Sequence, residues 1–116
     1  MALYFETQTP NGLLKAFKKA IDDGHISTWS YDSQGDFTHT PEQWNKLAWF
    51  RPKVIEKKQL VFSIIRPKNR NISSEVYAVY HGRFLESILV HCDTLFTKSI
   101  ATALPAETDN VAPSAR

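Results

Sequence analysis

The chain has 116 residues, a length that fits a single domain with its own hydrophobic core. Apolar residues make up 42% of it and charged residues 22%, a composition typical of folded soluble proteins that excludes a disordered chain. The formal charge of +2 is too small to indicate a nucleic-acid-binding protein by itself, and the single cysteine, Cys92, excludes an intramolecular disulfide.

The N-terminal part predicts a short strand followed by an amphipathic helix. Residues 2–7 form the expected strand, and Thr9 is the N-cap of the helix. Pro10 is its first residue, where the missing N–H costs nothing. Gly24 ends the helix because glycine adopts positive φ readily. The apolar residues at helical spacing are Leu13, Leu14, Phe17, Ala20 and Ile21.

A hairpin is predicted after this helix. Residues 25–31 are rich in β-branched and aromatic side chains and predict a strand, with Trp29 and Tyr31 on the same face. Residues 32–36 have the composition of a turn. Residues 37–39 are then expected to return antiparallel to the first strand.

A short helix and a second hairpin follow. Thr40 with Gln43 three residues later forms a capping-box pattern, and the helix is expected to be short because a strand-like segment begins soon afterwards. Residues 47–55 and 59–66 predict a β-hairpin, since apolar residues alternate in the second segment. Pro52 cannot donate to a strand ladder, which predicts an edge or irregular strand at that position.

Residues 73–96 predict a long helix. Its apolar stripe consists of Tyr77, Tyr80, Phe84, Ile88 and Leu95. Gly82 lies in the middle and disfavours a helix by about 1 kcal/mol relative to alanine, so residues 75–80 have a strand as their alternative structure. Residues 99–104 predict a last strand, and residues 105–116 have the composition of a disordered tail.

The element order is therefore β-α-β-β-short α-β-β-α-β. We expect an α+β fold in which a largely antiparallel sheet carries two main helices on one face, because that arrangement buries both apolar stripes. Residues 1–104 would form the single domain. The N-terminus lacks the basic start of a signal peptide, and no apolar run approaches the ~18 residues of a membrane span. We expect a cytoplasmic protein with no membrane partner.

Two histidines lie within the apolar arc of the long helix. His81 and His91 are ten residues apart, about 15 Å along a helix, so one metal ion cannot bind both. The ordinary interpretation is that both are hydrogen-bonded within the core. The alternative is a pocket formed by Tyr77, His81 and His91 in a small enzyme. No catalytic motif, metal site or cofactor site is predicted.

A basic and aromatic surface is the strongest functional candidate. Trp49, Arg51 and Lys53 alternate along one predicted strand and therefore share a face, which Trp29 and Tyr31 are expected to join. The candidate residues are Trp29, Tyr31, Trp49, Arg51, Lys53, Arg66, Lys68 and Arg70. Such a surface can stack bases and hold phosphates, or become buried against another protein. The ordinary alternative is that the tryptophans belong to the core.

The sequence thus predicts a non-enzymatic protein-interaction or ligand-binding module. Its expected partner is another protein or a second copy of the chain, as in a homodimer. The alternative function is nucleic-acid binding by the basic and aromatic face, and the third is a small enzyme that uses a helix histidine. The residues resemble no family whose motifs can be quoted.

Overall fold

Six antiparallel strands form one sheet in the computed structural model, which describes residues 2–105 and 109–111. The strands are β1 (Ala2–Glu6), β2 (Trp29–Tyr31), β3 (Phe37–His39), β4 (Trp49–Ile55), β5 (Gln59–Ile65) and β6 (Lys98–Ala101). Their order across the sheet is β2-β3-β4-β5-β1-β6. The predicted α+β architecture with an antiparallel sheet and two helices is confirmed.

The β4–β5 hairpin lies at the centre of the sheet. Its register pairs Trp49 with Ile65 and Ile55 with Gln59, and β1 pairs antiparallel with the other side of β5. The turn between the strands has positive φ at Glu56 (50°) and Lys57 (60°). Two central residues with positive φ are typical of type I′ turns, whose twist matches that of the flanking strands.

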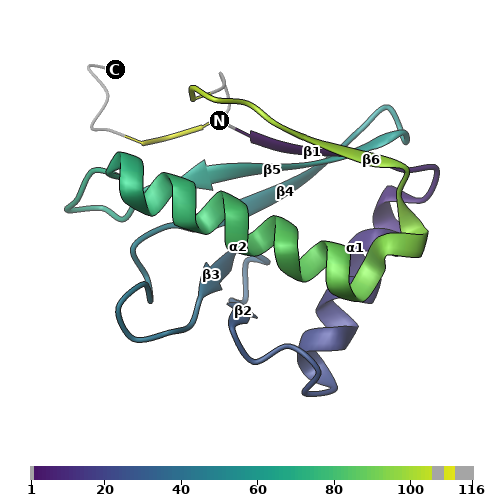
Figure 1. Ribbon diagram of the computed structural model, residues 1–116, viewed down its shortest axis with the longest axis horizontal. Helices are drawn as coiled ribbons and strands as arrows, with labels where there is room; N and C mark the ends of the chain where they lie inside the picture. The colour runs from purple at the N-terminus through teal and green to yellow at the C-terminus, as the bar shows by residue number, and fades with distance from the viewer. Residues whose placement is uncertain (1, 106–108, 112–116) are drawn as a thin grey trace.

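Two helices cover one face of the sheet, and we call this the covered face. Helix α1 (Pro10–Asp22) and helix α2 (Ser74–Cys92) meet through Phe17 and Phe84, whose ring centroids are 5.2 Å apart. Figure 1 shows α2 running across the front of the strands. A short 3-10 helix, η1 (Asp93–Leu95), connects α2 toward β6.

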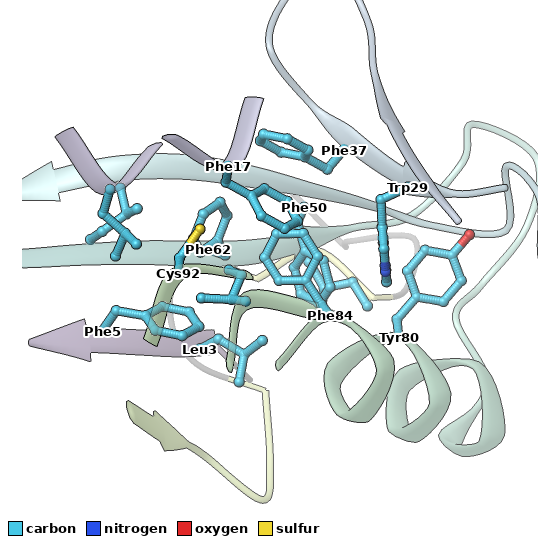
Figure 2. Packing of buried hydrophobic residues seen from close by; sticks show 14 of the residues in the cluster. Leu3, Phe5, Phe17, Trp29, Phe37, Phe50, Phe62, Tyr80, Phe84 and Cys92 are labelled. Atoms are coloured by element: carbon cyan, nitrogen blue, oxygen red, sulfur yellow. The ribbon is translucent and has the colours of Figure 1, made fainter. Parts of the chain in front are cut away.

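The core between helices and sheet is built mainly from aromatic rings. Phe84 is at its centre, with ring centroids 4.6 Å from Phe50, 4.7 Å from Phe62 and 4.8 Å from Trp29. Figure 2 shows these rings between α2 and the strands. Such edge and tilted contacts add to the stabilisation from burial alone. The core thus joins α2 directly to β2, β4 and β5.

Helix α2 is continuous through residues 75–80, which excludes a strand there. Ser73 caps it by accepting a hydrogen bond from the Val76 N–H at 3.1 Å. Gly82 is exposed in the middle of the helix. The packing of Tyr77, Tyr80 and Phe84 against the core outweighs the weak helix propensity of one glycine.

The prediction of a short helix from Thr40 and Gln43 is wrong. Residues 41–47 form successive turns, in which the Trp44 N–H donates to the Pro41 carbonyl and the Leu47 N–H to the Trp44 carbonyl. The Thr40 hydroxyl donates to the Ser27 carbonyl at 2.7 Å. It is therefore engaged with a distant segment instead of capping a helix.

The end of the chain partly packs against the sheet. Asn110 pairs in parallel with Ile65, and the Asp109 carboxylate accepts a hydrogen bond from the Ile64 N–H at 2.8 Å. The expectation of a tail without packing is therefore wrong for residues 109–111. The rest of the predicted tail, 106–108 and 112–116, lies outside the described residues.

Candidate binding surface

The face of the sheet that points away from both helices is the open face. Strand alternation places a second set of apolar side chains on it, and none of them belongs to the core cluster between the helices and the sheet. These residues are Tyr4, Trp49, Ile55, Val61, Ile65 and Ile100. Arg51, Lys53 and Ser63 lie among them. The open face is thus apolar with two cations on β4.

A hollow of about 400 Å³ lies in the middle of the open face. Val61 and Ser63 of β5 form its floor and are nearly inaccessible to solvent although no helix covers them. Longer side chains enclose them, with Arg51 and Lys53 on β4 at one side and Tyr4 on β1 at the other. The hollow is therefore lined mainly by apolar side chains, with two basic residues at one side and an aromatic ring at the other.

Arg51 is fixed at its wall by an ion pair with Asp36. Its Nε donates to Oδ1 at 3.1 Å and its Nη2 to Oδ2 at 2.9 Å, while 55% of the Arg51 side chain and 7% of the Asp36 side chain are exposed. The hydrogen bonds to Asp36 and its negative charge raise the pKa of Arg51. Two-point pairing orients the guanidinium and leaves its Nη1 without a hydrogen bond to Asp36.

Lys53 is exposed and has no ion pair within the described part of the chain. It lies directly opposite Val61, which in turn lies opposite Tyr4. At the far end of the same face, Lys98 forms an ion pair with Glu6 at 3.7 Å. The uncompensated positive charge next to the hollow therefore comes from Lys53.

Two of the predicted surface residues are not on this face. Trp29 is 1% exposed and stacks on His39 within the core, with ring centroids 4.4 Å apart. Tyr31 lies on the covered side, where its hydroxyl donates to the Asp22 carboxylate and Lys18 lies over its ring. The expectation that Trp29 and Tyr31 join Trp49 is wrong, because β2 pairs with β3 so that both rings point toward the helices.

The basic residues after β5 have different environments. The Arg66 guanidinium donates to the carbonyl oxygens of Pro67 and Lys68, each at 3.0 Å, and so supports its own loop. Lys68 and Arg70 are exposed on that loop. The loop follows β5 at the end where Ile65 pairs with Trp49, so its two exposed cations lie beyond that end of the hairpin.

The predicted helix pocket is brought together only in part. His81 is buried, its Nδ1 donates to the Tyr77 carbonyl at 2.6 Å, and its ring packs on Tyr77. His91 is exposed, so it does not join them. Tyr77 lines a separate hollow of about 220 Å³ with Ile72.

His39 is a buried polar residue that no sequence pattern singles out. Its Nδ1 lies 2.7 Å from the Thr28 carbonyl, which can only accept, so Nδ1 carries the proton. Nε2 is then an acceptor, and it is buried without a partner among the described residues. Burial lowers the pKa of His39, with a smaller contribution from Arg83. His39 therefore favours the neutral form.

The described residues offer no metal site and no reactive thiol. Within residues 2–105 and 109–111, no group of three or more histidine, cysteine or acidic side chains is placed to hold a metal ion. No helix of that part of the chain is long and apolar enough to cross a membrane. Cys92 is buried, and its burial raises the pKa of the thiol, which disfavours the nucleophilic thiolate.

Comparison with protein-family models, with curated proteins and with solved structures finds no match to this chain.

Proposed function

We propose that the protein is a non-enzymatic binding module and that the open face of its sheet is the binding surface. The hollow on that face carries the proposal, because apolar side chains that a protein leaves outside its core commonly mark a binding site. Lys53 adds a positive charge next to a mainly apolar lining. The favoured partner therefore combines negative charge with an apolar or aromatic group.

The chemistry of the lining residues supports binding over catalysis. The described side chains that line the hollow include no histidine, the commonest proton-transfer group, and no carboxylate. A second copy of the chain is a less favourable partner than an acidic one. It would bring the uncompensated Lys53 of both copies to the same interface, and like charges there oppose association.

The proposal is tested with naphthalene-2-sulfonate, an aromatic anion, by measuring amide chemical shifts in NMR spectra. We expect saturable shifts at Lys53, Val61 and Ser63, and their disappearance in Lys53→Glu. Lys15→Glu is the matched control because Lys15 is an exposed lysine of α1. Shifts confined to the helices, or the absence of any saturable shift, would show that the open face is not the binding surface.

A further inference from the structure

Half of the basic residues of the chain lie in one segment. Residues 49–72 contain seven of the 14 lysine and arginine residues but one of the 12 acidic residues, Glu56. The segment comprises β4, β5 and the loop that follows. The small formal charge of the whole chain therefore hides a strongly basic hairpin, and a clustered basic stripe is typical of a surface that binds a polyanion.

The cations follow the length of the hairpin. Lys57 and Lys58 lie at its turn, Arg51 and Lys53 on β4, and Lys68 and Arg70 in the loop at the opposite end. Each strand has seven residues and so spans about 23 Å. Positive charges at the turn, on the strand and in the loop are therefore spread along the length of the hairpin. An extended chain of phosphates needs such a distribution.

Not every cation in the segment is available to a partner. Arg51 is paired with Asp36, and Arg66 holds the carbonyl oxygens of its own loop. The remaining cations are exposed and have no ion pair among the described residues. They are Lys53, Lys57, Lys58, Lys68 and Arg70. Arg51 and Arg66 are therefore held by contacts within the protein, and the other five cations remain available to attract an anionic partner.

Two aromatic side chains lie beside this line of charge. Trp49 is opposite Ile65 and Tyr4 is opposite Val61 on the two sides of β5. Strand geometry separates the two positions by about 13 Å along the strands and about 10 Å across them. Both side chains are partly exposed. Each position thus offers a ring to a flat partner group.

We propose that the open face binds single-stranded nucleic acid. Phosphates would contact the five available cations, and unpaired bases would stack on Trp49 and Tyr4. The base faces of a duplex are stacked on one another and cannot contact the aromatic rings, and an acidic peptide has no bases to stack on them. Neither partner therefore uses both the cations and the two aromatic side chains. This inference rests on the proposed function, since it names the partner of the same surface.

The test measures fluorescence anisotropy of labelled oligothymidylate and oligouridylate of about eight nucleotides, within the site sizes of comparable grooves. We expect binding at low salt that weakens steeply as salt rises. Lys53→Ala and the double variant Lys68→Ala/Arg70→Ala should each weaken binding and lower the salt dependence. The log–log slope should fall by about 0.7 for each phosphate that the protein no longer neutralises.

The aromatic positions give a separate readout. Trp49→Ala should weaken binding roughly tenfold with the salt slope unchanged, because stacking is not an ionic contact. Trp49→Phe should restore most of the affinity. Lys15→Ala, on the exposed side of α1, is the control and should bind as the unmodified protein does.

Three results would overturn the inference: no binding at low salt, equal affinity for duplex of the same length, or equal affinity for an oligoglutamate of similar length. If any of these occurs while naphthalene-2-sulfonate still shifts the amides of the hollow, the open face binds an anion of another class. If both measurements fail, the proposed function fails with the inference.

Discussion

The two faces of the sheet are formed by the same strands but have different surroundings. On the covered face, Phe50, Phe62 and Ile64 are fully buried under the helices. On the open face, Trp49, Ile55 and Ile65 of the same strands remain partly exposed. Apolar content alone therefore does not decide what becomes core, since the packed helices decide it. The uncovered set lies outside the core cluster, as the proposed binding surface requires.

The largest expected difference between the faces is in stability. Phe84→Ala removes the ring that contacts both Phe50 and Trp29 and should lower the free energy of unfolding by about 3–5 kcal/mol. Trp49→Ala removes a cross-strand pairing with Ile65 and should cost under about 1 kcal/mol. Urea denaturation measures both.

Phe84→Leu keeps most of the apolar volume and serves as the milder variant if Phe84→Ala does not fold. A cost for Trp49→Ala as large as that for Phe84→Ala would contradict the distinction between the two faces. It would mean that the open face contributes to the stability of the isolated chain.

The covered face also contains a buried histidine, His39, whose protonation should lower stability in acid. His39 is 2% exposed, with Trp29 stacked on its ring, and burial lowers its pKa in the folded state. Its unfolded pKa is about 6.5, so the unfolded chain takes up a proton first as pH falls. The stability that His39 contributes is therefore complete above about pH 6.5 and is lost as pH falls toward its lower folded pKa.

Urea denaturation between pH 8 and about pH 5 measures this decrease in stability, and His39→Phe should flatten the curve because phenylalanine keeps a ring and cannot titrate. The hydrogen bond with the Thr28 carbonyl opposes the lowering of the His39 pKa, and Arg83 and Glu86 of α2 act on it in opposite directions, so burial decides the direction of the shift. An unchanged pH dependence in His39→Phe would show that acid acts elsewhere in the molecule.

The sequence predicts local features of the two faces better than distant ones. Helical periodicity predicts α1 and α2, and strand alternation places Trp49, Arg51 and Lys53 together, as the register shows. Sequence alternation misplaces Trp29 because the face of that residue depends on which strand pairs with β3. That register is set by Phe37 opposite Phe50, a pairing between segments that periodicity cannot relate.

The same limit explains the other errors. The Thr40 hydroxyl bonds to Ser27, thirteen residues earlier, and this bond replaces the predicted cap. The backbone of Asn110 bonds to Ile64 and Arg66, and that of Val111 to Ile72, which composition does not reveal. The basic hairpin, by contrast, is visible in the sequence when charges are counted within residues 49–72 instead of over the whole chain.

The smallest expected effect concerns the outer side of α2, a surface that faces neither the core nor the open face. Gly82 is exposed, and a Cβ atom added there would meet no atom within 4 Å apart from its chain neighbours and the backbone of its own helix. Gly82→Ala should therefore raise the free energy of unfolding by about 0.5–1 kcal/mol, because alanine restricts the unfolded chain and favours the helix. Thermal and urea denaturation measure the gain, and binding at the open face should not change. A decrease in stability would mean that α2 needs a flexible position at its middle. A gain in stability with altered binding would mean that the covering helix and the open face are coupled through the sheet.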